Sequence, residues 1–165
     1  MYVACLTFIG AALTSLATQT LRVNTYAQVT GDLISNARGA VDTMAQEVRF
    51  GASIYTPTSR LGTTAPTLGQ LSLETTRNLP TGESTTYVDF YVDAGRLYRK
   101  RENGAAEILT SERVTVQNLS FTSLNASSRS PAVRMSITLV PQGTVVSVGP
   151  QPSVTLMTTA ALRTN

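Results

Sequence analysis

The sequence has no histidine and no tryptophan, and it holds a single cysteine and a single lysine. Histidine is the commonest general base in enzymes and the commonest metal ligand in proteins. A lone cysteine forms no disulfide within the chain, and Cys5 lies in an apolar stretch where a free thiol behaves as a small hydrophobe. No phosphate-binding loop, zinc motif, calcium loop or nucleophile elbow is present. We therefore predict that the protein is not an enzyme and has no catalytic residue, cofactor, metal site or small-molecule substrate.

Charge is also absent from the first 21 residues, since Arg22 is the first charged side chain. A helix that spans a membrane needs about 20 predominantly apolar residues. Residues 2–17 are strongly apolar and residues 18–20 dilute the end of the run, so it is long enough to cross a bilayer with help or to be buried among similar helices. We predict a transmembrane or filament-core helix over residues 1–23. Its characteristic residues are Val3, Leu6, Phe8, Ile9, Gly10, Ala12, Leu13 and Leu16.

A cleaved secretory signal is the main alternative for this apolar run. Such signals begin with a basic segment, and no basic residue precedes the run. The helical pattern also continues beyond Ala17 and does not give way to a new mature start. A lipoprotein signal needs an apolar stretch before its cysteine, and Cys5 is too close to the start for that. We therefore favour a retained anchor.

The helical pattern continues over residues 24–56, where it becomes amphipathic. Apolar side chains recur at spacings of three or four residues, which is the period of a helix with one buried face. Gly51 and Pro57 supply stop signals near its end. We expect the later part of this stripe to pack on the following domain, whereas the part before about Gly31 needs a neighbouring subunit as its partner. The stripe consists of Val23, Tyr26, Val29, Leu33, Ala37, Val41, Met44 and Val48.

Residues 57–165 are predicted to form a globular antiparallel β domain. Apolar and polar side chains alternate most clearly over residues 86–92 and 133–140. Turns at residues 93–95 and 103–104 indicate hairpins, and we expect a bulge near Asn118. The predicted fold is α+β, with the long N-terminal helix packed on a single antiparallel sheet of about six strands. The inner face of that sheet should be formed largely by Val88, Phe90, Val133, Met135, Ile137 and Leu139.

One basic cluster lies on a predicted strand, and it consists of Arg96, Tyr98, Arg99, Lys100 and Arg101. Basic and aromatic residues together can contact nucleic acid. Charges on a strand also protect an exposed sheet edge from pairing with other chains. Three adjacent basic residues on a strand point to both faces of the sheet. We favour the second interpretation, and a nucleic-acid partner is not predicted.

Several segments together resemble those of the type IV pilin and pseudopilin family, and of its minor pilins in particular. The apolar start YVACLTFIGAALTSL runs directly into an amphipathic helix. The stretch NARGAVDTMAQEVRFGASIY resembles the family's pattern of an asparagine-alanine-arginine turn, an apolar-acidic pair separated by four residues from Glu-apolar-Arg, and a small-residue exit. The hairpin TTYVDFYVDAGRLYRKRENG resembles a strand pair of minor pilins, and LTSERVTVQNLSFT and VTLMTTAALRTN fit the same pattern. The resemblance covers the whole chain through motifs of apolar type and spacing.

One element of the family pattern is missing from this sequence. The family's processing site is a glycine followed by phenylalanine, with a glutamate early in the mature chain, and here Asp32 is the first acidic residue. Either the chain begins inside the family's hydrophobic segment or this member lacks the motif. No peptidase site and no N-terminal glutamate are carried over.

The resemblance implies a pilin-like structural subunit or assembly initiator of a type IV pilus-like or type II secretion-like filament. Its partners would be other pilin or pseudopilin subunits and the membrane. It would lie in the inner, cytoplasmic membrane as a single-pass protein, with the β domain outside the cytoplasm, and enter a cell-surface filament. The alternative is a solitary membrane-anchored extracytoplasmic domain that binds DNA or another surface. The filament subunit and the solitary domain can be distinguished by testing whether residues 1–30 self-associate.

Overall fold

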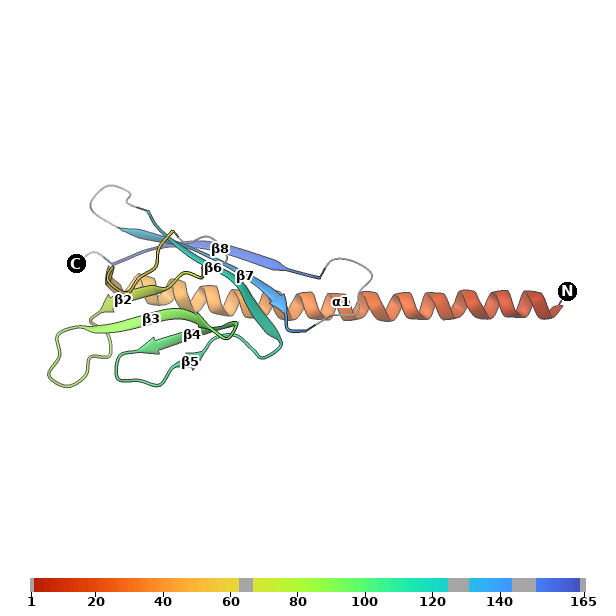
Figure 1. Ribbon diagram of the computed structural model, residues 1–165, viewed down its shortest axis with the longest axis horizontal. Coiled ribbons are helices and arrows are strands. Elements are labelled where there is room, and N and C mark those ends of the chain that lie inside the picture. Colours follow the sequence, from red (N-terminus) through yellow and green to blue (C-terminus); the bar gives the residue numbers. More distant parts are fainter. Residues whose placement is uncertain (1, 63–66, 125–130, 144–150, 164–165) are drawn as a thin grey trace.

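The computed structural model describes residues 2–62, 67–124, 131–143 and 151–163, without the side chains of residues 2–9, 12 and 22. A single long helix, α1 (Tyr2–Phe50), precedes all the strands. One half of α1 lies against the strands and the N-terminal half extends away from them (Figure 1). The predicted α+β class with a long N-terminal helix is confirmed. Among the residues described, no helix is both long enough and apolar enough to cross a membrane.

The strands and the C-terminal half of α1 together form the body of the protein. This half of α1 packs on the strands through the apolar stripe that the sequence predicts. Val29 is partly buried against the apolar core of the body. Val23 and Tyr26 belong to the same stripe but are 70% and 46% exposed, because they precede the region in which α1 contacts the strands. The prediction that the later part of the stripe packs on the following domain is therefore confirmed. Its buried members are Leu33, Ala37, Val41, Met44 and Val48.

The helix ends at Phe50, and the predicted continuation to residue 56 is wrong. Gly51 begins β1 (Gly51–Ile54), which pairs antiparallel with β2 (Leu71–Thr75). A Cβ atom at Gly51 would lie 3.2 Å from the carbonyl oxygen of Val48 and 3.4 Å from Cδ2 of Leu162. This crowding favours glycine where the chain leaves the helix. Pairing with β2, which is distant in the sequence, overrides the local helical pattern.

The strands form two antiparallel sheets, so the predicted single sheet is also wrong. One sheet has the order β1-β2-β3-β4-β5 and the other the order β6-β7-β8. β5 follows the predicted turn at residues 103–104 and pairs with β4, but it is only two residues long. The next strand, β6, pairs with β7 and not with β5, so the first sheet ends at β5. The remaining strands are β3 (Thr86–Asp93), β4 (Arg96–Arg101), β5 (Glu107–Ile108), β6 (Val114–Leu124), β7 (Ala132–Pro141) and β8 (Val154–Ala161).

The two sheets meet where the β3–β4 hairpin approaches β6. The backbone N–H of Val116 donates to the carbonyl oxygen of Gly95 at 2.8 Å. Gly95 has a φ of 76°, and a Cβ atom there would lie 2.8 Å from Cγ2 of Thr115, so both the turn and the contact require glycine. The predicted hairpin at residues 93–95 is confirmed. The register of β6 against β7 shifts between Val116 and Asn118, which confirms the predicted bulge.

One apolar core lies between α1 and the sheets. The helix packs chiefly on β7 and β8, and also contacts β2. Phe121 and Leu119 of β6 are fully buried in the same core. Burial of each large apolar side chain contributes about 1.5–3 kcal/mol of stability. The predicted inner-face residues are confirmed, since each is at most 2% exposed: Val88, Phe90, Val133, Met135, Ile137 and Leu139.

Candidate functional site

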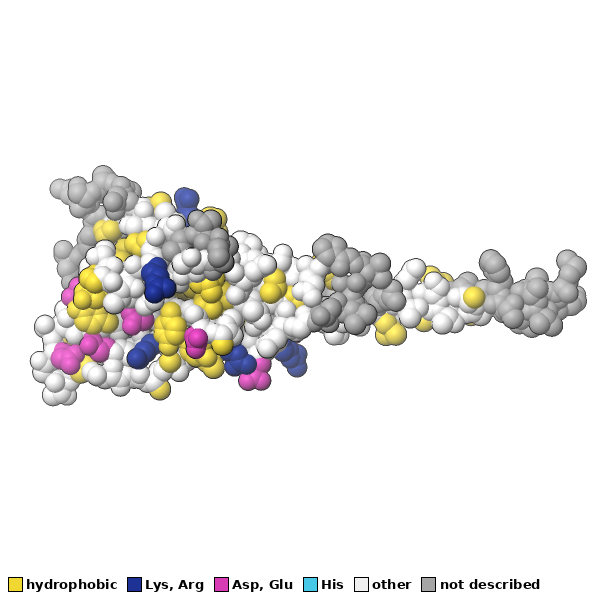
Figure 2. Space-filling model, viewed as in Figure 1, with side chains coloured by type: hydrophobic (Ala, Val, Ile, Leu, Met, Phe, Trp, Pro, Cys, Tyr) yellow, Lys and Arg dark blue, Asp and Glu magenta, His cyan; other side chains and the backbone are white. Residues whose placement is uncertain are grey.

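The part of α1 that extends beyond the body, here called the projecting segment (residues 10–28), exposes every side chain that the structure describes there. On the face shown in Figure 2, hydrophobic side chains and no charged ones occur along its described part. Large exposed apolar side chains, which here alternate with polar ones, are typical of an interface with protein or membrane. Its most exposed apolar residues are Leu13 (62%), Leu16 (61%), Leu21 (67%) and Val23 (70%).

The residues predicted for a membrane or filament helix all lie in α1. Gly10, Leu13 and Leu16 are exposed. A Cβ atom at Gly10 would meet no atom within 4 Å apart from the adjoining helix backbone. The body therefore leaves this surface free for a partner. The side chains of the other predicted residues lie outside the described part of the structure: Val3, Leu6, Phe8, Ile9 and Ala12.

A shallow groove runs along one side of the projecting segment. Gln19 and Asn24 place amide groups along it, and neither amide has a hydrogen-bond partner among the residues that the structure describes. The apolar lining residues are spaced so that they share one face of the helix. Such a groove suits the side chains of a second helix. It is lined by Leu16, Gln19, Thr20, Val23, Asn24 and Ala27.

The threonine hydroxyls of the projecting segment are satisfied within the helix itself. Thr14, Thr18, Thr20 and Thr25 each donate a hydrogen bond to the carbonyl oxygen four residues earlier, at distances from 2.5 to 3.0 Å. A hydroxyl that is already bonded loses less free energy on transfer to apolar surroundings than one that must abandon water without a partner. These threonines therefore do not oppose burial of the helix against lipid or other helices.

The predicted basic cluster on β4 is divided between the two faces of its sheet. Arg99 and Arg101 face α1, whereas Tyr98 lies on the opposite face and stacks on a tyrosine of β3 at 5.5 Å between ring centroids. Lys100 is exposed, and Arg96 lies 3.3 Å from a carboxylate in the segment after β5. The expected division between faces is confirmed. Each arginine of the cluster has an acidic partner, so the strand does not present a row of free positive charges.

Arg99 and Arg101 share one buried carboxylate, that of Glu47 on α1. Oε1 of Glu47 accepts a hydrogen bond from Nη1 of Arg99 at 2.9 Å and from Nη2 of Arg101 at 2.6 Å, and the residue is only 8% exposed. Arg99 also pairs with Glu107 of β5. These contacts tie α1 to the five-stranded sheet. Sequence reasoning missed them; the one available signal was an acidic residue three positions after Met44, at the edge of the buried stripe.

We expect Glu47→Gln to lower the free energy of unfolding by roughly 2 kcal/mol, because Arg101 would lose its one acidic partner among the described residues and Arg99 would keep only Glu107. Partial exposure of Arg101 reduces the loss below that of a fully buried pair. Asp42→Asn, at an exposed carboxylate on the same helix, is the matched control and should change stability by less than about 0.5 kcal/mol. Urea denaturation measures both. Equal midpoints for the two variants would show that the Glu47 pairs do not stabilise the fold.

A search for metal-binding clusters among the described residues found none, since no group of three or more acidic or cysteine side chains is arranged there to hold a metal ion. Comparison with known proteins gave no matching family model, and no match among curated proteins or solved structures. The candidate functional site is therefore the projecting segment, whose exposed surface is suited to assembly.

Proposed function

We propose that this chain is a pilin-like structural subunit or assembly initiator of a type IV pilus-like or type II secretion-like filament. The observation that carries the proposal is the projecting segment, with its exposed apolar side chains and its distance from the body (Figure 1). In the family that the sequence resembles, such a helix first anchors the subunit in the cytoplasmic membrane. It then joins a helical bundle at the filament core, while the β domain faces outward. The partners would be the helices of other pilin or pseudopilin subunits.

The polar groups of the projecting segment support a helical bundle as its final surroundings. An apolar helix exchanges lipid for neighbouring helices at little cost, because both surroundings are apolar. The helix backbone and the threonine hydroxyls are bonded internally. The charge of Arg22 remains, as do the amides of Gln19, Asn24 and Gln28, and lipid tails offer these amides no hydrogen bonds. A neighbouring helix that carries amides satisfies them, which favours helices over lipid alone.

Leu16→Arg is expected to prevent incorporation into filaments or hetero-oligomers while the body stays folded. Leu16 is 61% exposed, so the isolated chain accommodates arginine there. In apolar surroundings the charge costs about 2.5–3.5 kcal/mol, on the order of a hundredfold in the equilibrium. Met157→Arg on β8 is the matched control, since Met157 is also apolar and 63% exposed. Recovery of each variant in sheared filaments measures incorporation, and thermal melting measures folding.

A milder change separates anchoring from assembly. Gly10→Leu keeps the helix apolar and removes only the close approach of a neighbouring helix. We expect it to stay in the membrane fraction and to enter filaments less efficiently. If Leu16→Arg, Gly10→Leu and Met157→Arg were all incorporated as well as the unaltered chain, the proposal would fail, and a solitary membrane-anchored binding domain would be the better account.

A further inference from the structure

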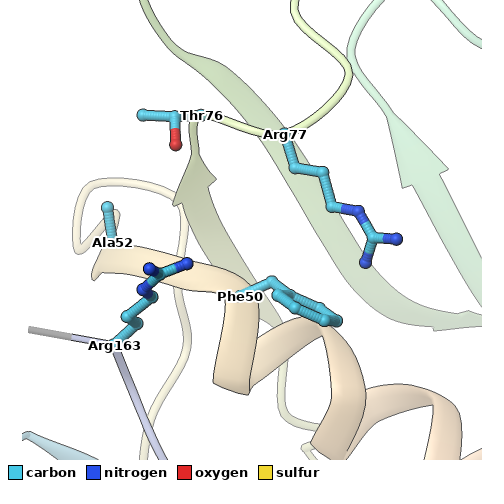
Figure 3. A pocket seen from close by; sticks show the side chains of 5 residues that line it. All are labelled: Phe50, Ala52, Thr76, Arg77 and Arg163. Atoms are coloured by element: carbon cyan, nitrogen blue, oxygen red, sulfur yellow. The ribbon is translucent and has the colours of Figure 1, made fainter.

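A hollow lies beside Phe50, the last residue of α1. This end of the helix is the one away from the projecting segment (Figure 1). The volume of the hollow is about 400 Å³. Figure 3 shows that its side chains come from the end of α1, from β1 and from the segments that follow β2 and β8. It is therefore built from three parts of the chain that are far apart in the sequence, namely residues 50–52, residues 76–77 and residue 163. The lining residues are Phe50, Ala52, Thr76, Arg77 and Arg163.

Hydrogen bonds fix these segments relative to one another. Oγ1 of Thr75 donates to the carbonyl oxygen of Phe50 at 3.2 Å, and the backbone N–H of Arg163 donates to the carbonyl oxygen of Gly51 at 3.2 Å. The backbone N–H of Arg77 in turn donates to Oγ1 of Thr75 at 3.2 Å. The hollow is thus formed by the fold itself. The carbonyl oxygens of Phe50 and Gly51 each accept one of these hydrogen bonds, so the arginine side chains are not needed to satisfy them.

The hollow carries uncompensated positive charge. Cζ of Arg77 lies 4.2 Å from the centroid of the Phe50 ring, and Figure 3 shows Arg163 on the other side of Phe50, below Ala52. No acidic residue lines the hollow, and neither arginine forms an ion pair within the described part of the chain. Four other arginines do form ion pairs there: Arg96, Arg99, Arg101 and Arg113.

We propose that this hollow binds a phosphate monoester of a small organic molecule. Guanidinium groups form charge-assisted, bidentate hydrogen bonds to phosphate, whose oxygens accept from several directions at once. Arg77, Arg163 and the hydroxyl of Thr76 line the hollow as donors. Phe50 and Ala52 supply an apolar wall for the body of the ligand, and the hollow is roomier than an isolated phosphate ion requires. The site lies at the end of the body away from the projecting segment.

Phenyl phosphate is the probe, because it joins a phosphate to an apolar ring. It is titrated into the full chain in a maltoside detergent, which carries no phosphate, with inorganic phosphate and benzoate as comparisons. Calorimetry gives the dissociation constants, and NMR follows the Nε–H groups of the arginines. We expect phenyl phosphate to bind about tenfold more tightly than either comparison ligand. Arg77→Gln and Arg163→Gln should each weaken binding about tenfold, because each removes charge-assisted hydrogen bonds.

Arg134→Gln is the matched control, since Arg134 is an exposed arginine of β7 without an ion pair among the described residues. It should bind the probe as the unaltered chain does. Unchanged affinity in the Arg77→Gln/Arg163→Gln double variant would overturn the proposal, as would benzoate binding as tightly as phenyl phosphate. The resonances of Arg77 and Arg163 in the unaltered chain locate the site without relying on a variant. If those two resonances do not shift with saturation, the proposal is likewise wrong.

Discussion

Deletion of residues 1–28 should give a soluble, folded monomer, whereas the full chain should be recovered with membranes or filaments. The described side chains of residues 10–28 are all exposed, and burial begins at Val29 and is complete at Leu33. The deletion therefore removes no described core contact. Asp32 would lie in the first turn of the shortened helix, where a carboxylate interacts favourably with the helix dipole. We expect the melting temperature of the truncated chain to stay within about 5 °C of that of the full chain in detergent.

Light scattering after size exclusion measures the state of association, and circular dichroism measures melting. A truncated chain that does not fold would show that the projecting segment stabilises the body, which the exposed side chains argue against. A full chain that is itself a soluble monomer would contradict the proposed function directly. The two failures differ, because the first concerns the fold and the second concerns the partner of the projecting segment.

Met44→Asp should unfold the body or lower its free energy of unfolding by more than about 4 kcal/mol. Met44 is fully buried on the face of α1 that packs on the core. The substitution loses the packing of a long apolar side chain, worth about 2–5 kcal/mol, and buries a carboxylate with no partner. Domains of this size are stable by only about 5–15 kcal/mol in total. The expected loss is therefore a large share of the whole stability.

Two other methionine substitutions serve as controls for Met44→Asp. Met44→Leu keeps the apolar volume and should cost less than about 1.5 kcal/mol. Met157→Asp introduces the same charge at a methionine that is 63% exposed, and it should change stability by less than about 0.5 kcal/mol. Urea midpoints compare the variants. A Met44→Asp midpoint close to that of Met157→Asp would show that this face of α1 is not packed in the body.

Features that depend on neighbours in the sequence were predictable. The spacing of Leu33, Ala37, Val41, Met44 and Val48 placed them on one face of a helix, and all are buried. The alternation in β3 and β7 likewise placed Phe90 and Ile137 inward. The turn at residues 93–95 and the bulge near Asn118 were visible for the same reason. Helical and strand periods assign a side chain to a face without reference to any distant residue.

Features that depend on distant residues were not predictable in this way. Alternation within β6 shows which side chains share a face, but not whether the strand lies beside β5 or β7, so the division into two sheets escaped prediction. The helix end was misplaced because β2 lies beyond a long loop and competes for residues 51–54. The pairing of Glu47 with Arg99 and Arg101 joins residues 52 and 54 positions apart.

The same division holds for the two surfaces to which we propose a function. The sequence by itself determined that α1 begins with an uncharged, apolar stretch and continues as an amphipathic helix, since composition and period are local properties. Only the tertiary structure decided that contact with the body stops between Val29 and Tyr26, leaving the projecting segment exposed. The tertiary structure also decided which of the described arginines lack an ion pair. An ion pair forms only where the fold brings opposite charges close together in space. Arg101 pairs with Glu47 and Arg99 pairs with Glu47 and Glu107, whereas Arg77 and Arg163 lie on different sides of Phe50 with no acidic residue lining the hollow.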